Sequence, residues 1–350
     1  MRAALVLLAV WCLLELSWAQ RVSQLQWLAR LRGRWRRPQA QWADGRARDC
    51  PLECDCPVRF PEAMYCHGRN LHHVPYVPSH VKYVYLQGNR ITGVQDGVFD
   101  NATDLVWVVL SQNRLDSQKI GKKVFSGLKR LERLYLDHNQ LTRVPPNLPR
   151  SLTDLRLGHN SISQVRAEAF EGMTELSTLQ LHANSIEDAG GAFQGLSSLA
   201  VLDMRRNNLR KMPENLPERL HQLYLGSNKI ESIPADFLST RPKLQFLRLT
   251  GNMLTDKGIP SNVFNVSTLV ELDLSHNQLE RIPIFSRDLE NLYLQANRIK
   301  EFTLSSFCRP GDMRHYSQLR VLRLDANRIS ARDVPAEAVY CLRLAASIDV

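Results

Sequence analysis

The sequence predicts a curved α/β solenoid, with a parallel sheet on its concave face and irregular, 3-10 or polyproline segments on its convex face. A nine-residue frame, L-x-x-L-x-L-x-x-N, recurs eleven times at intervals of 20 to 30 residues. Its apolar positions alternate, which is the pattern of a strand with one buried face. One such strand cannot bury that face alone, so successive frames are expected to stack around a shared core.

The frame ends on an asparagine in every copy. The eleven positions are Asn89, Asn113, Asn139, Asn160, Asn184, Asn207, Asn228, Asn252, Asn277, Asn297 and Asn327. An asparagine amide both donates and accepts hydrogen bonds, so a column of these side chains can satisfy buried backbone groups where the strands end. This consensus and period define a leucine-rich repeat, and its leucines and asparagines over residues 76–297 are predicted to be structural.

The backs of the repeats differ in length. Shorter repeats contain a proline pattern, at residues 144–149 and 212–217, which favours polyproline-like backs. Longer repeats contain Phe125, Phe170 or Phe193. There we expect a short helical turn, with the phenylalanine filling the core from the convex side.

Residues 1–19 have the pattern of a signal peptide. Arg2 precedes an apolar run from Ala3 to Leu14, and residues 17–19 offer small side chains for cleavage. No other run reaches the roughly 18 apolar residues of a transmembrane helix. The mature chain is therefore expected to be secreted and to contain six cysteines, an even number that indicates disulfides in an oxidising compartment.

Residues 20–49 form a basic extension that is expected to be disordered. It contains eight arginines against two aspartates, so it supplies +6 of the formal net charge of +10. Arginine captures sulfate and carboxylate groups in a bidentate manner, which favours a sulfated glycosaminoglycan as partner. The alternative is a solvated tail without a specific partner. The arginines expected to bind are Arg30, Arg32, Arg34, Arg36 and Arg37.

Four cysteines, Cys50, Cys54, Cys56 and Cys66, precede the first frame. Zinc is the competing explanation, but secretion and the lack of paired C-x2-C units argue against it. The open end of a solenoid exposes core leucines and needs a cap. Two disulfides within residues 50–75 would supply that cap, in which Met64 to Pro75 are similar to a degenerate repeat.

Cys308 and Cys341 are the two cysteines that remain, and they flank the last frame. The interval that contains Cys308, between Asn297 and Asn327, is the longest at 30 residues. We expect these two cysteines to pair and to close the C-terminal end, residues 298–350.

Two sequons, at Asn101 and Asn265, are candidate N-glycosylation sites. Each asparagine lies four residues before the first leucine of its frame. Both glycans would therefore leave from the same exposed edge of the solenoid. The alternative is an unused sequon.

The outward-facing strand positions are rich in tyrosine, tryptophan and arginine, the residues that dominate interface energetics. A protein-binding concave face is therefore predicted. The alternative is that these side chains only pack on one another across the strands. The predicted contact residues are Tyr85, Trp107, Tyr135, Arg156, Tyr224, Arg248, Tyr293 and Arg323.

Catalytic patterns are not found in the sequence. There is no glycine-rich phosphate loop, zinc motif or nucleophile elbow. His138, His159 and His276 stand directly before a frame asparagine, which is a turn position. We therefore expect no enzymatic activity, no cofactor, no metal and no nucleic-acid partner.

Residues 50–350 resemble the small leucine-rich-repeat proteoglycans of the extracellular matrix, and among them class II. The resemblance is carried by the spacing of the first four cysteines, by the short–long–long rhythm of the repeats and by the pair Cys308 and Cys341. Five stretches are similar almost word for word to one member of the class. They are residues 63–66, 97–103, 131–139, 289–295 and 341–344.

The resemblance implies disulfides Cys50–Cys56 and Cys54–Cys66, and an extended "ear" repeat closed by Cys308–Cys341. It implies binding to fibrillar collagen and regulation of fibril assembly. It also implies N-glycans that can carry keratan sulfate, because Asn101 and Asn265 match two acceptor positions of the family.

The chain departs from its relatives in two ways. The most similar member has an acidic, tyrosine-rich extension, whereas residues 20–49 are basic and resemble the heparin-binding extension of another member. Glu175 and His315 stand where relatives have acceptor asparagines, so a lower keratan sulfate load is expected. The alternative function is that of a signalling protein that sequesters growth factors or binds membranes and molecular patterns.

Overall fold

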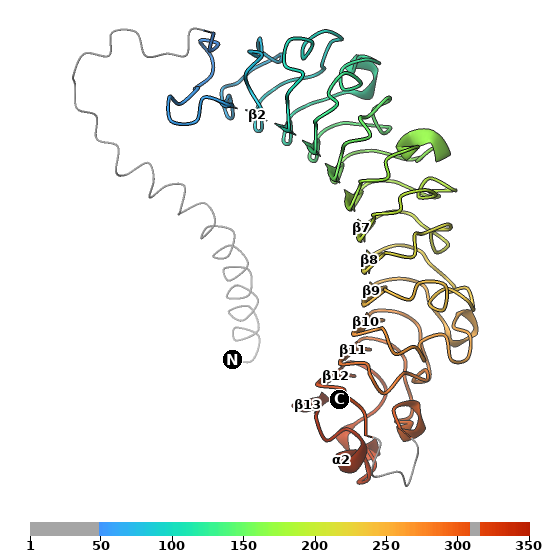
Figure 1. Cartoon of the computed structure of the whole chain (residues 1–350). Coiled ribbons are helices and arrows are strands. Elements are labelled where there is room, and N and C mark those ends of the chain that lie inside the picture. Colours follow the sequence, from blue (N-terminus) through green and yellow to red (C-terminus); the bar gives the residue numbers. More distant parts are fainter. Residues whose placement is uncertain (1–48, 309–315) are drawn as a thin grey trace, which may run out of the picture. The chain divides into compact units, whose positions relative to one another are not determined.

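The computed structural model describes residues 49–308 and 316–350. In these residues, strands of three residues each form one parallel sheet in chain order, and it lines the concave side of the curved compact unit Arg46–Val350 (Figure 1). The strands are β1 Ala63–Tyr65, β2 Tyr83–Tyr85, β3 Trp107–Val109, β4 Arg133–Tyr135, β5 Asp154–Arg156, β6 Thr178–Gln180, β7 Val201–Asp203, β8 Gln222–Tyr224, β9 Phe246–Arg248, β10 Glu271–Asp273, β11 Asn291–Tyr293, β12 Val321–Arg323 and β13 Ser347–Asp349. The predicted solenoid is confirmed.

The eleven frames correspond to β2 through β12, one strand for each frame. The degenerate repeat forms β1, as expected. β13 was not expected: its frame has Ala345, Ile348 and Val350 at the apolar positions, and all three pack against the core. The predicted signal peptide, residues 1–19, and residues 20–48 with all five candidate arginines lie outside the described residues.

Helical structure in the described residues is confined to single turns on the back of the repeats. These are η1 Ser117–Lys119, η2 Ala167–Phe170, η3 Asp256–Gly258, η4 Leu304–Ser306, η5 Ala331–Asp333 and α2 Ala338–Cys341. The expected helical turn forms at Phe170 but not at Phe125 or Phe193, which lie in non-helical turns. Near Phe193 the reason is visible: Gly190, at the position where the turn at Phe170 begins, has a φ angle of +48°, outside the helical region.

The core is filled from both faces of the solenoid. The central leucines of the strands, such as Leu134 and Leu155, are fully buried and face one another in register. Phenylalanines enter from the convex side and stack from repeat to repeat; the ring centroids of Phe99 and Phe125 are 6.2 Å apart. A convex back that is wider than the strand face bends the stack of repeats.

The frame asparagines form a continuous hydrogen-bonded ladder. Each of the eleven donates from Nδ2 to the carbonyl three residues before it and to the equivalent carbonyl of the preceding repeat. Asn207 shows the pattern: its Nδ2 donates to Met204 O and Leu181 O, both at 3.0 Å, and its Oδ1 accepts from Ile186 N at 3.0 Å. One buried side chain therefore joins two turns of the solenoid.

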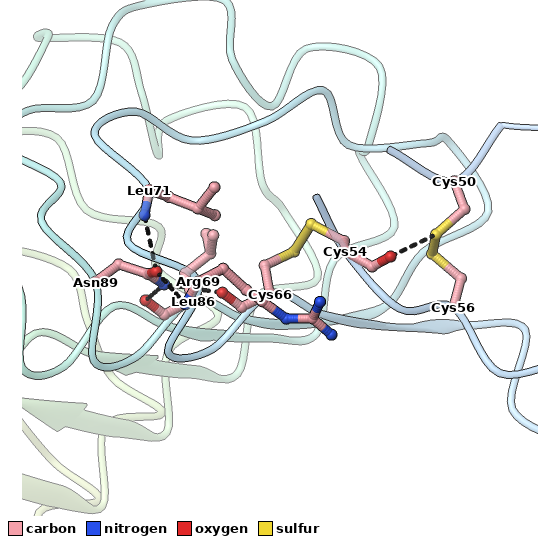
Figure 2. Close-up of a disulfide and its surroundings, with 8 residues drawn as sticks. All are labelled: Cys50, Cys54, Cys56, Cys66, Arg69, Leu71, Leu86 and Asn89. Carbon is pink, nitrogen blue, oxygen red and sulfur yellow. Dashed lines mark hydrogen bonds between the residues drawn. A yellow bond between two sulfur atoms is a disulfide. The ribbon is translucent and has the colours of Figure 1, made fainter. Parts of the chain in front are cut away.

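Three disulfides, Cys50–Cys56, Cys54–Cys66 and Cys308–Cys341, lie at the two ends. They are the pairings that the family resemblance implied. At the N-terminal end, Cys66 is fully buried, and Asn89 Nδ2 donates to its carbonyl at 2.9 Å, so the ladder reaches the cap (Figure 2). The backbone of Asp55 pairs antiparallel with Tyr65 and covers the outer edge of β1, which would otherwise be open to pairing.

Replacing Asn207 by alanine is expected to lower the free energy of unfolding by about 3 kcal/mol. The buried N–H of Ile186 loses its acceptor, and the carbonyls of Leu181 and Met204 each lose one of their two amide donors. Asn208→Ala is the matched control, since the side chain of Asn208 makes no hydrogen bond to the described residues. Chemical denaturation of both variants with intact disulfides measures the difference. Equal losses for the two variants would contradict the structural role of the ladder.

Candidate binding surface on the concave face

The strands place the predicted contact residues on one surface. Successive side chains of a strand point to opposite faces of the sheet, so a central inward leucine leaves the first and third positions on the concave face. All eight predicted residues occupy such positions and all are half-buried. The sheet is parallel and in register, so these side chains stand in columns across neighbouring repeats.

Four aromatic side chains form a continuous ladder across β1 to β4. Tyr65 stacks on Tyr85 with ring centroids 4.9 Å apart and planes 4° apart. Trp107 then meets Tyr85 and Tyr135 edge to face, at 5.6 and 5.4 Å. Tyr65 is missing from the predicted set because β1 belongs to an incomplete frame, although Tyr65 holds the same third strand position as Tyr85.

Two arginines extend this aromatic ladder. The guanidinium of Arg133 lies 5.1 Å from the centroid of Trp107, and that of Arg156 lies 4.0 Å from the centroid of Tyr135. Such cation–π contacts stabilise by about 0.5 to 2 kcal/mol. The Tyr135 hydroxyl donates to Asp154 Oδ2 at 2.7 Å, which Arg156 also reaches at 3.1 Å. Burial and this hydrogen bond raise the pKa of Tyr135 to about 12.

Three histidines lie where β4, β5 and β6 end. The rings of His138 and His159 stack at 4.0 Å, and His182 meets His159 edge to face at 5.2 Å. Gly158 makes room for this group, because a Cβ there would lie 2.5 Å from the His182 ring. Burial, reinforced by the neighbouring histidines and Arg206, lowers the pKa of His159.

His182 is held against a carboxylate. Its Nδ1 lies 3.4 Å from Asp203 Oδ2 without forming a hydrogen bond, so the contact is an ion pair only when the histidine is protonated. Arg205 binds the same carboxylate through two hydrogen bonds of 3.0 and 2.7 Å. Burial lowers the pKa of His182, and Asp203 opposes that effect only in part.

The C-terminal half of the surface consists mainly of charge pairs. Tyr224 lies between Arg205 and Arg248, whose guanidinium carbons are 5.6 and 5.2 Å from its ring centroid. Arg248 Nε also donates to Glu271 Oε1 at 2.7 Å. At the end of the sheet, a separate group joins Arg323 to Asp325 at 3.1 Å.

The eight predicted residues therefore fall into groups. Tyr85, Trp107, Tyr135 and Arg156 are brought together in the aromatic ladder. Tyr224 and Arg248 form a second contact, and Tyr293 and Arg323 are register neighbours on β11 and β12. The partial burial of these side chains results from the contacts among themselves, so both interpretations of the aromatic column, binding and mutual packing, agree with the geometry.

The two sequon asparagines, Asn101 and Asn265, are exposed. Over residues 49–308 and 316–350, no group of three or more His, Cys, Asp or Glu side chains is placed to hold a metal ion. Within the same residues, no helix has the length and apolar character needed to cross a bilayer.

Comparison with known proteins identifies the family. Leucine-rich-repeat models match residues 79–141, 150–209 and 268–287. Fibromodulin of Bos taurus is 55% identical over 303 residues, which cover 87% of this chain and 81% of fibromodulin. This chain belongs to the small leucine-rich-repeat proteoglycans. Lumican of Gallus gallus is 46% identical over 303 residues, covering 86% of this chain and 88% of lumican.

The predicted resemblance to this proteoglycan family is thereby confirmed, and these relatives are structural proteins of the extracellular matrix rather than enzymes. The stretches singled out in the sequence, such as residues 131–139, are those that resemble fibromodulin.

Solved structures agree on the fold. A chain of the octameric complex of Latrophilin 3, Unc5D and FLRT2 (LRR) superposes with a TM-score of 0.62 at 28% identity, covering 79% of this chain and 77% of that one. A leucine-rich-repeat protein of Leptospira interrogans gives a TM-score of 0.56 at 18% identity, covering 79% of this chain and 81% of that one.

The histidine group predicts a pH-dependent stability. The folded-state pKa values of His159 and His182 lie below the unfolded value of about 6.5. The unfolded chain therefore binds more protons as the pH falls through 6.5, and the free energy of unfolding should decrease from pH 7 to pH 5. The double variant His159→Gln/His182→Gln should show a shallower decrease in denaturation experiments. His276→Gln, in the same turn position as His159 but exposed, is the control. Identical pH profiles for the natural protein and both variants would refute the assignment.

Proposed function

We propose that this proteoglycan is secreted and acts without catalysis, binding fibrillar collagen through its concave face and adjoining edges and modulating fibril assembly. The observation that carries this proposal is the aromatic ladder with its two arginines, Tyr65 to Arg156. Membership of the family of fibromodulin and lumican, together with the signal-peptide pattern of residues 1–19, supports the extracellular location.

The chemistry of the ladder suits a collagen chain. Collagen winds three polyproline-like chains that have proline-rich sequences and no internal hydrogen bonds within each chain. Aromatic-lined grooves are a recurring receptor for polyproline segments, because the ring faces accept the rigid, pre-extended chain. Arg133 and Arg156 lie over the Trp107 and Tyr135 rings and could donate hydrogen bonds to solvent-exposed carbonyls beside those rings.

We further propose that the arginines of residues 20–49 bind sulfated glycosaminoglycan. Their density, eight arginines in thirty residues, supports electrostatic capture of a polymer with closely spaced sulfates.

Asn101 and Asn265 are proposed to carry N-glycans, with keratan sulfate as an extension of those glycans. The support is that both asparagines are exposed and share one phase of the repeat. Each asparagine lies six residues before the start of a strand, β3 for Asn101 and β10 for Asn265. A glycan attached there is expected to leave the aromatic ladder on the concave face accessible.

Collagen binding is tested by removing the ladder. The variant Trp107→Ala/Tyr135→Ala/Arg156→Ala should bind fibrillar collagen at least about tenfold more weakly, since interface anchors of this kind contribute on the order of 2 kcal/mol each. A second variant, Tyr224→Ala/Arg248→Ala/Tyr293→Ala, tests the C-terminal half. Cosedimentation with collagen fibrils measures both.

The control for this experiment is Tyr76→Ala/Arg166→Ala, which removes one exposed tyrosine and one exposed arginine, both outside the strands. It should bind like the natural protein. If the natural protein does not sediment with fibrils at micromolar concentration, collagen binding is excluded.

Glycosaminoglycan binding by the extension is tested in the full-length chain. Replacing Arg30, Arg32, Arg34, Arg36 and Arg37 by glutamine should shift elution from a heparin column to lower salt, because fewer sulfates are neutralised. Unchanged retention would reject the role of these arginines. Loss of binding to anionic vesicles, with heparin retention unaltered, would favour a membrane-binding function instead.

A further inference from the structure

Positive charge in the folded repeats is concentrated in one stretch. Residues 114–150 contain nine Lys and Arg against three Asp and Glu, a net charge of +6 that equals that of the N-terminal extension. The rest of the sequence after the extension, residues 50–113 and 151–350, contains 27 Lys and Arg against 29 Asp and Glu. The basic character of the solenoid therefore comes from this stretch alone.

The fold gathers cations from this stretch on the back and edge of neighbouring repeats. Lys119 ends η1, and its carbonyl accepts a hydrogen bond from Val94 N at 3.0 Å. The carbonyl of Lys122 accepts from Asn147 Nδ2, also at 3.0 Å. Asn147 in turn lines a groove of about 520 Å³ together with Lys129 and Arg150. Lys122 and Lys123 thus adjoin the groove that Lys129 and Arg150 line.

These five cations are exposed and have no carboxylate within ion-pair distance in the part of the chain that the structure describes. Three other basic residues of the stretch have contacts: Arg130 pairs with Asp104 at 3.1 Å, Arg143 donates to Ser117 O, and Arg133 lies over Trp107. Arg114 is exposed and likewise without an ion pair among the described residues, but it precedes η1 and does not line the groove. Five unpaired like charges in adjacent segments repel one another, and an anionic partner would relieve that repulsion. The five cations considered are Lys119, Lys122, Lys123, Lys129 and Arg150.

Arg150 is placed by the next repeat. Its Nε would lie 2.7 Å from a Cβ at Gly172, whose φ is +74°, so this glycine lets the guanidinium side chain cross the backbone closely. Glu168 and Glu171 also line the groove, so two carboxylates limit its basic surface. An anionic ligand would therefore lie along the Lys122–Lys129–Arg150 side.

We propose that this basic groove, defined by Lys119, Lys122, Lys123, Lys129 and Arg150, is a second binding site for sulfated glycosaminoglycan, separate from the N-terminal extension. Exposed, spread cations suit a flexible polyanion better than a small anion, which needs convergent and desolvated donors. One polymer that engages the groove and the extension together would bind more tightly than either site allows alone, by raising the effective concentration at the second site. The collagen proposal is independent of this site.

The test compares four full-length proteins for binding of a heparin oligosaccharide at several salt concentrations. They are the natural protein, the groove variant Lys122→Gln/Lys123→Gln/Lys129→Gln/Arg150→Gln, the five-arginine extension variant described above, and the combination of both. The groove variant should lose about tenfold in affinity, and its plot of log K against log salt should be shallower by about 2 to 3, as expected for three or four lost charge contacts. The extension variant should retain binding that the combination removes.

The matched control removes the same charge from scattered, exposed positions: Lys211→Gln/Lys229→Gln/Lys243→Gln/Lys257→Gln. The proposal is overturned if the groove variant binds like the natural protein or no worse than this control, or if the extension variant alone abolishes binding.

Glu168→Gln/Glu171→Gln should raise the affinity, because two repelling carboxylates are removed from the groove wall. Loss of binding to phosphatidylserine vesicles without loss of heparin binding would assign the groove to membranes and refute the proposal. Unchanged unfolding transitions in all variants exclude misfolding.

Discussion

The asparagine ladder is the constraint on which the rest of this structure depends. A solenoid turn ends its strand after three residues, and the carbonyls released there are buried between neighbouring repeats. Asn207, like its ten counterparts, satisfies carbonyls of two repeats with one amide and accepts a backbone N–H with its oxygen. An aspartate or leucine of similar size could not provide both functions. The repeats are thus held at a fixed separation and in one register.

That register produces the candidate binding surface. Strands held in register about 4.8 Å apart bring side chains of the same frame position within contact distance, and large side chains also reach diagonal neighbours, as Trp107 reaches Tyr85 and Tyr135. Tyr65, Tyr85, Trp107 and Tyr135 are 20 or more residues apart in sequence from one to the next, yet their rings are in contact. The C-terminal half has the same backbone but carries charge pairs such as Arg248 and Glu271. The aromatic end is therefore the part of the surface best suited to an apolar, extended partner.

The same register also determines the back of the molecule. Segments after the strands are free to vary, because the ladder and the leucines already close the core. Prolines, phenylalanines and single helical turns fill this space in different repeats, and charged residues collect there without disturbing the sheet. The basic groove near Arg150 uses this freedom, since its lysines belong to loops whose backbone is fixed by hydrogen bonds to neighbouring repeats.

The sequence by itself determined the strands β2 to β12, the inward leucines, the ladder asparagines and the outward columns. All of these follow from a short period that recurs in register, and a period is visible without a structure. It predicted the concave residues as a set, and the cysteines that close the ends.

Only the tertiary structure decided which side chains are in contact. It placed Tyr65 at the head of the aromatic ladder, stacked His138 on His159, added the final strand β13, and left the lysines of the basic groove without a carboxylate. The reason is that such contacts depend on side chains from turns that are distant in sequence, on their conformations and on the irregular backs between them, none of which is encoded in the repeating frame.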